Sequence, residues 1–567
     1  MNQFTDRLRA ALAELTGLDA DAIKLERPKK AELGDFAFPC FPLAKTLRQA
    51  PPKIAAELAP KIAEAVPEIE CLATGPYLNF KLDRGALASA VVGAVLAEGA
   101  SYGGSDEGAG KTVVIDFSSP NIAKPMHVGH LRSTILGAAI ERLHDHFGYQ
   151  TVGVNHLGDW GSQFGKLIAA LERWSDTVDL EGEPIRALLA LYVRYHEEEE
   201  SDPSLPARAA EVFRELESGE EGEVRATWRR LTELSLREFQ RVYDRLNVSF
   251  DHFRGEAWYE NLLDPTVDRI VASGVTEESE GALVVDLSEH EKNMPPCRLR
   301  RTDGTTLYAT RDLAAVFSRF EEFAFDRCLY VVGSEQRLHF RQLKAVLQRM
   351  ELDWEPRVQH VDFGLLRLPE GKLSTRKGKV IFLDELLDRA VAEAERVIVE
   401  KSPDLPNKEE VAEQVGVGAV VFHDLKKERV KDVVFDWDEV LSFSGDTGPY
   451  VQWTHARLGS ILSKGQAAGL EAGADFDGSL LSDADQLCLA MGSFGDVLRV
   501  AARDAEPSIL TSWVADFARE VNKWYVDHRV LSDDESLSRA RLALVRAAQI
   551  VINTSLGILG VAAPERM

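Results

Sequence analysis

The sequence of 567 residues contains only five cysteines, and no two of them form a CxxC pair. This spacing argues against a disulfide framework and a cysteine zinc site, so we expect five buried free thiols. Long hydrophobic runs are also missing, since no stretch approaches the ~20 apolar residues that a membrane span requires. The opening MNQFTDRLRAALAEL lacks the apolar centre of a secretory signal, which makes the cytoplasm the expected location.

Positive charge is scarce as well. The chain has 66 Lys and Arg against 92 Asp and Glu, a net charge of −26. Such a chain repels polyanions at long range, so any nucleic acid must bind at local basic patches. Internal repeats and low-complexity tracts are absent from the sequence. A chain this long exceeds one hydrophobic core, and its length suggests about three or four domains.

The sequence pattern changes along the chain. Residues 1–105 mix helical patterns with short apolar strands and end in a Gly-rich stretch, which predicts an N-terminal α+β domain. Over residues 106–400, apolar runs alternate with helical stretches, as in a Rossmann-like α/β domain with a parallel sheet. The charged segment at about 171–250 is expected to be a solvated helical insertion. Residues 401–567 carry long 3.6-residue periodicities, which predict an all-α bundle.

The stretch SPNIAKPMHVGHLRS follows the apolar run VVIDF and precedes a helical pattern that begins near Val128. His127 and His130 therefore fall between a strand end and a helix N-terminus, where free N–H groups attract phosphates. A zinc site is disfavoured because helical metal pairs usually use i, i+4 spacing beside an acid. Two solvent-facing histidines are the alternative for HxGH by itself. Gly129 favours a nucleotide cradle, since a side chain there would block a flat base from the helix start.

A second signal is GKLSTRKGKV, from Gly371 to Val380. Its Lys and Arg side chains, in a Gly-flanked loop, suit closure over a triphosphate and neutralisation of the leaving pyrophosphate. Alone, the stretch is no more than a basic surface turn. Two phosphate-handling elements that bracket one α/β domain together predict a nucleotide-dependent enzyme.

HVGH and KLSTRKG resemble the HIGH and KMSKS signatures of class I aminoacyl-tRNA synthetases. The stretches SPNIAKPMHVGHLRSTILG, HLGDWGSQFG, GPYVQWTHARL, GDFAFPCFPLAK, GPYLNF and the terminal PERM resemble the arginyl-tRNA synthetases in particular. This resemblance covers nearly the whole chain, with the motifs in the same order. It implies that arginine and ATP form arginyl-adenylate, and that the arginyl group passes to the 3′-terminal adenosine of tRNA(Arg) for protein synthesis.

The resemblance also implies an ATP site built from both signatures. Its residues are His127, Gly129, His130, Lys372, Ser374, Arg376 and Lys377. Thr375 stands where the family signature has its second lysine, so that charge must come from elsewhere. Lys124 is the expected substitute and joins His127, His130 and Lys372 as catalytic residues; Arg376 or Lys377 is the rival donor. ATP is expected to bind with Mg²⁺ as a substrate complex, without a tightly bound cofactor, zinc or protein-bound metal.

Five positions match the family's arginine site: Asn121, Glu256, Tyr308, Asp312 and Gln336. A guanidinium presents a rigid fork of donors, which carboxylates such as Glu256 and Asp312 are suited to pair. Tyr308 and Asp312 are four residues apart and share a face if helical. Asn121 and Gln336 would bind the backbone or amino group of arginine. Without the resemblance, Asp312 is better interpreted as a surface acid and Gln336 as a loop amide, because lone polar residues are usually solvated.

Two alternatives and one residue remain open from the sequence. A class I synthetase for a neutral amino acid would leave two carboxylates unpaired in its pocket, which the acidic pair argues against. A non-catalytic RNA-binding descendant is disfavoured by the intact signatures. Asp159, in HLGDWGSQFGK, either orients arginine or magnesium or caps a helix.

The partners implied by the resemblance are tRNA(Arg), arginine and ATP, and we expect a monomer without membrane contact. Tyr450, Trp453 and Arg457 in GPYVQWTHARL have the composition that stacks unpaired anticodon bases, with core packing as the rival interpretation. Trp524 and Tyr525 are interpreted as core residues.

Tyr77 and Asn79 in GPYLNF match a family position that contacts the D-loop of tRNA. From spacing alone, YLNF is simply a strand whose side chains alternate between two faces. These two residues complete the expected tRNA contacts.

Overall fold

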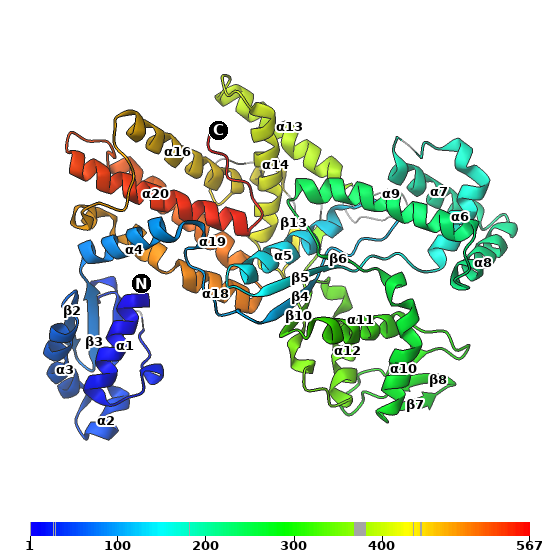
Figure 1. Cartoon of the computed structure of the whole chain (residues 1–567), viewed down its shortest axis with the longest axis horizontal. Helices are drawn as coiled ribbons and strands as arrows, with labels where there is room; N and C mark the ends of the chain where they lie inside the picture. Colours follow the sequence, from blue (N-terminus) through cyan, green and yellow to red (C-terminus); the bar gives the residue numbers. More distant parts are fainter. Residues whose placement is uncertain are drawn as a thin grey trace.

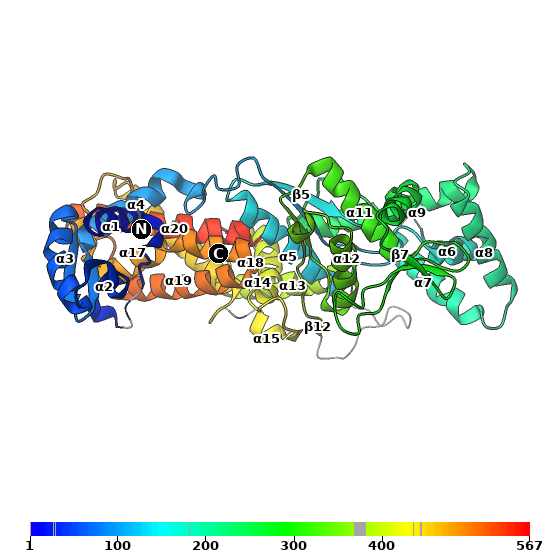
Figure 2. The same ribbon diagram turned by 90° about the horizontal axis from the view of Figure 1, so that it is seen from below.

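The computed structural model describes residues 2–26, 28, 30–180, 182–367, 382–434, 436–440, 442 and 445–567. The chain forms an elongated body, with its N-terminal region at one end and an inserted helical unit at the other (Figures 1 and 2). The central sheet and the C-terminal helices lie between these ends. No helix in the described ranges is both long and apolar enough to cross a membrane.

The N-terminal region is a small antiparallel sheet covered by helices. Its strands are β1 (Phe36–Pro39), β2 (Ile69–Thr74) and β3 (Tyr77–Leu82), paired in the order β1-β3-β2. The helical elements are α1 (Asn2–Thr16), η1 (Ala20–Ala22), η2 (Ala31–Leu33), α2 (Phe41–Leu47) and α3 (Pro51–Ala65). Helix α4 (Arg84–Glu98) and η3 (Gly99–Ser101) follow, and α4 packs against the C-terminal helices before the chain continues to the central sheet. The Asp83 side chain caps α4 by accepting the Ala86 N–H at 2.8 Å.

The central sheet has five parallel strands in the order β11-β10-β4-β5-β6. They are β4 (Thr112–Asp116), β5 (Gln150–Asn155), β6 (His252–Phe253), β10 (Arg327–Tyr330) and β11 (Val358–His360). Parallel strands require crossovers, and α5 (Val128–Asp145) joins β4 to β5 while α12 (Arg337–Arg349) joins β10 to β11. The strand predicted at VVIDF and the helix predicted to begin near Val128 are both confirmed.

Two segments are inserted between these strands. The unit between β5 and β6 is helical: α6 (Ser162–Trp174), η4 (Ser175–Thr177), α7 (Pro184–Glu198), α8 (Ser204–Glu217) and α9 (Glu223–Arg245). The segment between β6 and β10 contains η5 (Glu256–Leu262), α10 (Leu263–Ala272), β7 (Thr276–Ser279), β8 (Ala282–Val285), β9 (Cys297–Arg300) and α11 (Tyr308–Phe323). Strands β7, β8 and β9 form a separate antiparallel sheet beside α10, which the sequence patterns did not predict.

Helices dominate the rest of the chain. They are α13 (Leu383–Lys401), α14 (Lys408–Leu425), α15 (Trp437–Val440), α16 (Gly448–Ala467), η9 (Gly478–Ala484), α17 (Asp485–Gly492), α18 (Phe494–Asp504), α19 (Ser508–Asp527) and α20 (Glu535–Ile558). Two short helices, η6 (Ser334–Gln336) and η7 (Glu355–Arg357), flank α12. Strand β12 (Leu366–Arg367) pairs with β13 (Val433–Val434), an exception to the expectation that strands end near residue 401. The predicted fold class is confirmed.

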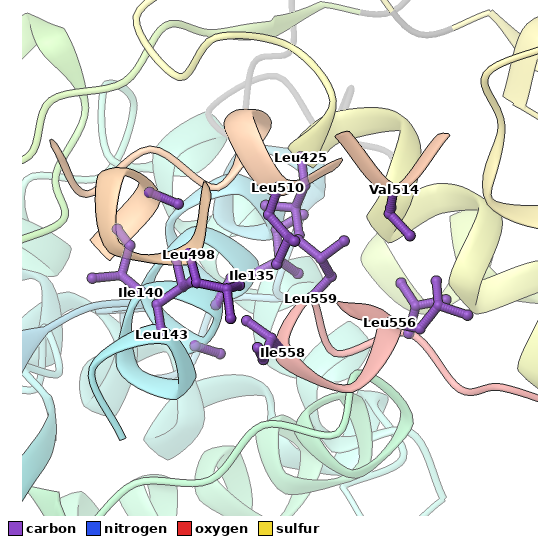
Figure 3. Close-up of a cluster of buried hydrophobic side chains, with 14 of the residues drawn as sticks. Ile135, Ile140, Leu143, Leu425, Leu498, Leu510, Val514, Leu556, Ile558 and Leu559 are labelled. Carbon is purple, nitrogen blue, oxygen red and sulfur yellow. The ribbon is translucent and has the colours of Figure 1, made fainter. Parts of the chain in front are cut away.

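Helix α5 is the centre of the molecule. Thirteen of its 18 residues are buried, so the helix is enclosed on nearly all sides. One side lies close to the first strand: a Cβ on Gly137 would come within 2.2 Å of Phe117. The other side contributes Ile135, Ile140 and Leu143 to a cluster with leucine, isoleucine and valine side chains of α14, α18, α19 and α20 (Figure 3). The sheet and the C-terminal helices therefore share one hydrophobic core. All five cysteines are buried and free, as predicted.

Candidate active site

The strand order reverses between β4 and β10. Crossovers from these two neighbours run to opposite sides of the sheet, and ligands of open α/β sheets bind where the strand ends diverge in this way. The predicted site residues follow the carboxyl ends of the strands: Asn121 and His127 follow β4, Asp159 follows β5, Glu256 follows β6, and Gln336 follows β10. The fold thus gathers residues from distant parts of the sequence at one edge.

His127 and His130 close the N-terminus of α5. The Gly129 N–H donates to Nδ1 of His127 at 3.0 Å, and the His127 N–H donates to Nδ1 of His130 at 3.1 Å. The two rings lie 4.0 Å apart between centroids. Because both Nδ1 atoms accept, each neutral ring carries its proton on Nε2 and offers a donor there.

Burial keeps this pair uncharged. Desolvation, with a smaller contribution from Lys124, lowers the pKa of His127. Desolvation and the neighbouring His127 lower the pKa of His130 to about 3. Both side chains are therefore neutral hydrogen-bond donors near pH 7. Positive charge beside them must come from other residues.

Gly129 is required by the cap itself. A Cβ at this position would lie 2.8 Å from Cε1 and 2.9 Å from Nδ1 of His127. The imidazole would then have to leave its place over the helix end. From the sequence, Gly129 was expected to leave space for a flat base. In the structure, the His127 ring occupies the space beside Gly129.

Lys124 supplies positive charge close to the two histidines. Its charge lowers the pKa of both rings, and its Nζ lies 5.4 Å from the ring centroid of Tyr192 in α7. The connection that carries Lys124 includes Ala123 at φ 62°, a left-handed conformation that is uncommon for a residue with a side chain. Such conformations are concentrated at functional sites.

The second signature, with Lys372, Ser374, Arg376 and Lys377, lies outside the described residues. The chain that follows it is described. Phe382 pairs through its backbone with His127, and the Leu383 N–H donates to the Met126 carbonyl at 2.9 Å. The segment that leaves the basic stretch therefore runs directly beside the histidine pair.

Acidic side chains occupy the neighbouring strand ends. Glu256 begins η5, where its N–H donates to the Leu157 carbonyl at 3.0 Å. Burial raises the pKa of Glu256 to about 7; Arg311 opposes this rise, whereas Asp159 and Asp312 add to it. These charges act on Glu256 because they are close to it, and the Arg311 guanidinium forms an ion pair with Glu260 at 3.0 Å.

Asp159 has a structural contact within this group. Its Oδ1 accepts the Ala257 N–H at 2.8 Å, and a Cβ on Gly255 would come within 2.3 Å of its carboxyl carbon. Asp159 thus binds the start of η5 from outside, whereas α6, the helix that follows Asp159, has Gly161 at its N-cap and no side-chain cap. Burial raises the pKa of Asp159 to about 6, against the lowering effect of the Ala257 hydrogen bond.

Tyr308 and Asp312 lie on the first turns of α11, and a histidine that the sequence analysis missed contacts both. His339, on α12, has its Nε2 2.6 Å from Oδ2 of Asp312. The rings of Tyr308 and His339 are stacked with centroids 4.5 Å apart. In the sequence, His339 appears only as one polar residue of the helical stretch QRLHFRQL.

The two amide residues lie on either side of this region. Asn121 pairs with Gly158 through its backbone, and a Cβ on Gly158 would meet the Asn121 Oδ1 at 2.3 Å. Gln336 is exposed at the end of η6, where its N–H donates to the Gly333 carbonyl at 3.0 Å. Both residues therefore border the edge formed by the β4, β5 and β10 strand ends.

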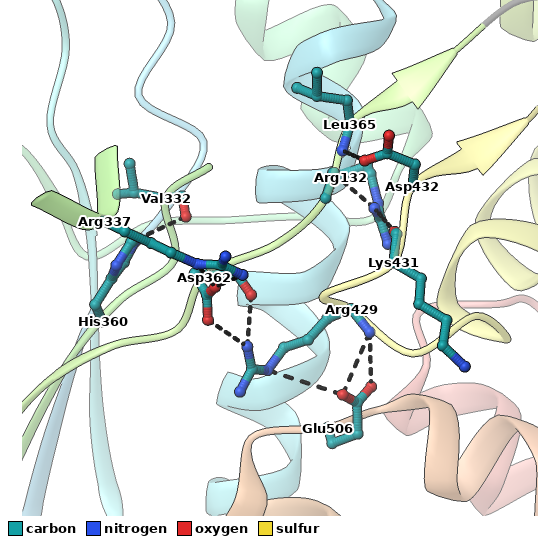
Figure 4. A network of polar contacts seen from close by, with 11 residues as sticks. Arg132, Val332, Arg337, His360, Asp362, Leu365, Arg429, Lys431, Asp432 and Glu506 are labelled. Carbon is teal, nitrogen blue, oxygen red and sulfur yellow. Dashed lines mark hydrogen bonds and ion pairs between the residues drawn. The ribbon is translucent and has the colours of Figure 1, made fainter. Parts of the chain in front are cut away.

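Polar contacts join the neighbourhood of Gln336 to the C-terminal helices (Figure 4). Arg337 and Arg429 both form ion pairs with Asp362. The backbone N–H of Arg429 also donates to the Glu506 carboxylate at 3.2 Å. One arginine thus bridges the sheet region and the corner that precedes α19.

The expected tRNA contacts lie on two separate regions. In β3, Tyr77 is exposed with its ring 5.9 Å from that of Phe41, whereas Asn79 is only 4% exposed. Nδ2 of Asn79 has no hydrogen-bond partner among the residues that the structure describes. Only a small part of the Asn79 side chain is thus accessible to a base at the surface of the small sheet.

Tyr450, Trp453 and Arg457 form a half-buried cluster on α16. The Arg457 guanidinium lies 3.6 Å from the Trp453 ring centroid and 5.4 Å from that of Tyr525, and Nη1 donates to Asn522. Trp453 also lines a cavity of about 300 Å³. Tyr525 is thus half-buried: it packs against the edge of the hydrophobic core, as expected in part, and also contacts the Arg457 guanidinium.

Trp524, by contrast, is buried as predicted.

Three features together define a class I aminoacyl-tRNA synthetase. They are the parallel sheet whose strand order reverses between β4 and β10, the paired histidines at the start of α5, and the appended helical domain. A family model described as "tRNA synthetases class I (R), catalytic domain" matches residues 91–437. Models of the "Arginyl tRNA synthetase N terminal domain" and the "DALR anticodon binding domain" match residues 2–82 and 451–567.

Whole-chain comparisons identify the particular family. The chain is 45% identical over 568 residues to the arginine–tRNA ligase of Clostridium botulinum strain Alaska E43, covering 100% of both chains. It is 47% identical to that of Clostridium beijerinckii, with 97% of each chain covered. The arginyl-tRNA synthetase structure from Thermus thermophilus superposes with a TM-score of 0.84 at 28% identity, covering 100% of both chains.

The chain belongs to the arginyl-tRNA synthetase family. It is a ligase that activates L-arginine with ATP and transfers the arginyl group to the 3′-terminal adenosine of tRNA(Arg). Its substrates are therefore arginine, ATP and tRNA.

Proposed function

We propose that His127 and His130 bind the phosphates of ATP through their Nε2–H groups, with Lys124 and Lys372 supplying positive charge. The two neutral donors at the start of α5 support this role, because the helix end adds positive potential in the same direction. Ser374, Arg376 and Lys377 complete the phosphate contacts, and Gly129 borders the adenine. ATP binds as its magnesium complex.

Glu256 and Asp312 bind the guanidinium of arginine, with Tyr308 beside them. Asn121 and Gln336 hold the α-amino and carboxylate end. The single observation that carries this assignment is the acidic group formed by Glu256 with Asp159 and Asp312. Glu256 and Asp159 follow β6 and β5, and β5 lies beside β4, the strand that leads to the histidine pair. Arg311 lies near these acids and pairs with Glu260, so the three acids outnumber the positive charge beside them. A forked cation compensates the remaining negative charge.

In the first step, a carboxylate oxygen of arginine attacks the α-phosphorus of ATP, and the bond to the pyrophosphate oxygen breaks. The protein need not form a covalent bond. Its contribution is to orient the two substrates and to stabilise the charge that develops on the phosphate oxygens. The two Nε2–H donors serve the second purpose without taking or giving a proton, because neither ring is charged near pH 7.

The surfaces at the two ends of the molecule bind tRNA(Arg). Tyr77 and Asn79 contact the D-loop, and Tyr450, Trp453 and Arg457 contact the anticodon loop, consistent with the stacked arginine and tryptophan on α16. The enzyme is a cytoplasmic monomer with three domains, at 1–105, 106–400 and 401–567, and a helical insertion at about 171–250.

Aminoacylation of a tRNA mixture with each amino acid in turn tests the substrate, and arginine alone should be transferred. Asp312→Asn tests the site: the KM for arginine should rise at least about tenfold, since one partner of a charged pair is lost, while the KM for ATP should not change. Asp268→Asn, an exposed acid on α10, is the matched control and should behave as the unaltered enzyme. Equal losses for arginine and ATP would contradict the assignment of Asp312 to the guanidinium.

A further inference from the structure

We infer that His339 is a positioning residue of the arginine site, which holds the Asp312 carboxylate and the Tyr308 ring in the orientation that receives a guanidinium. This inference rests on the proposed roles of Asp312 and Tyr308. It adds a third residue, from a different helix, whose side chain contacts both of them.

His339 reaches both residues from the facing helix. It is the third residue of α12, and its Nε2 lies 2.6 Å from Oδ2 of Asp312, while its ring stacks on Tyr308 at an interplanar angle of 26°. The His339 side chain is 9% exposed and that of Asp312 is 20% exposed. One buried ring therefore touches two side chains that are partly open to solvent.

The contact fixes a group that would otherwise rotate. A carboxylate has two oxygens, and His339 engages only Oδ2, so Oδ1 remains available to a guanidinium N–H. In the part of the chain that the structure describes, His339 is the one side chain that hydrogen-bonds to Asp312. Without it, Asp312 would sample several orientations, and arginine binding would have to order it.

The same ring orients the tyrosine. Tyr308 is 54% exposed at the start of α11, where a helix-terminal aromatic has few neighbours to fix its ring. Stacking on His339 holds this ring beside Asp312. A planar, forked cation depends on such fixed partners more than the flexible ammonium of lysine does. His339 should therefore contribute to the preference for arginine over lysine.

Two variants separate the two contacts. His339→Phe keeps an aromatic ring against Tyr308 and removes the donor to Asp312, whereas His339→Gln keeps a donor and removes the ring. Aminoacylation kinetics with arginine varied, at saturating ATP and tRNA, give KM and kcat for each variant. Calorimetric titration of arginine gives the Kd in the same samples.

With His339→Phe, we expect the KM and Kd for arginine to rise about 2- to 10-fold, the cost of ordering one more side chain on binding. The change should appear in KM rather than kcat, because the guanidinium contact is equally present before and during the reaction. His339→Gln should give a smaller rise. Both variants should lower the ratio of kcat/KM for arginine over lysine and leave the KM for ATP unchanged.

His360→Gln is the matched control. The Nε2 of this imidazole lies 2.9 Å from the Val332 carbonyl (Figure 4), and its ring stacks on Phe340, the neighbour of His339. Asp312 forms its side-chain hydrogen bond with His339 and not with His360. Its replacement disturbs the same part of α12 and should leave the KM for arginine unchanged. A rise as large as that of His339→Phe would mean that packing of α12, rather than the contact with Asp312, is responsible.

The outcomes separate this inference from the proposed site. If Asp312→Asn raises the KM for arginine and neither His339 variant does, the positioning role is overturned and the site stands. If Asp312→Asn has no effect, the site and the positioning role both fail. In the double variant His339→Phe with Asp312→Asn, the losses should be less than additive, because both changes remove the same interaction.

Discussion

Replacing Gly129 with alanine tests the histidine pair most directly. A Cβ there would lie 2.8 Å from Cε1 of His127, so the ring must leave the helix end and lose its hydrogen bond from the Gly129 N–H. Loss of such a cap costs about 1 kcal/mol, whereas alanine in place of glycine stabilises a helix by about 1 kcal/mol. The two effects oppose each other, so the free energy of unfolding should hardly change.

Activity should fall nevertheless. Displacing His127 removes one of the donors that we propose bind the phosphates, and losing one preorganised donor costs about 100- to 1,000-fold in rate. The assay is arginine-dependent ATP–pyrophosphate exchange in the presence of tRNA, with thermal unfolding of the same sample. Gly557→Ala, on α20, is the matched control, because a Cβ there meets nothing within 4 Å. If Gly129→Ala exchanged pyrophosphate as fast as Gly557→Ala, the role of the His127 ring would be refuted.

Burial raises the pKa of Glu256 to about 7, so this carboxylate is protonated below that pH, and the KM for arginine should rise as the pH falls from about 8 to about 6. Glu256→Gln should abolish this slope; a slope that persists would assign it to another group, such as Asp159. Arg132→Leu should lower the free energy of unfolding by about 3 kcal/mol or more, because it leaves the buried Asp424 unpaired, and urea denaturation measures the loss. Trp453→Ala should raise the KM for tRNA in aminoacylation without changing that for arginine, and equal changes in both would favour a purely structural role.

The sequence predicts those parts of the fold whose signals are local. VVIDF is a continuous apolar run bounded by turn residues, and it forms β4 as expected. Strands β6, β12 and β13 have two residues each, too few for any periodicity to register. In the β7–β9 sheet, which was missed, TEES and CRLR carry charged residues at alternate or adjacent positions and contain no apolar run. Only the middle strand, ALVV, has an apolar run, and it is just four residues long.

The site divides in the same way. HxGH is a contiguous motif whose residues meet each other within one helical turn, so the sequence predicts their neighbourhood. His339 and Asp312 are 27 positions apart and meet only because α11 and α12 pack together, which no local pattern encodes. Arg311, which lies among the acids, stands in the sequence as one more charge in TRDLA.

Adjacent residues on a half-buried helix face different surroundings. Trp524 and Tyr525 were both expected in the core, but neighbours on a helix point about 100° apart. Trp524 takes the buried direction, and Tyr525 turns toward the Arg457 guanidinium at the surface. The periodicity that predicted the helix also contained the information needed to separate the two.

Helix α5 connects the chemistry to the tRNA-binding domain by packing alone. Its first turn carries His127 and His130, and its later turns, from Ile135 to Leu143, form one cluster with α14, α18, α19 and α20 (Figure 3). With 18 residues at 1.5 Å each, the helix is about 27 Å long and stiff. Interiors packed this closely do not deform continuously, so a rotation of the C-terminal helices against the sheet must either carry α5 with it or open this core. If α5 moves, the Nε2–H donors of His127 and His130 move with it; if the core opens, apolar surface is exposed to water. The position of the histidine pair is therefore fixed by the packing of α5 against both the sheet and the C-terminal helices.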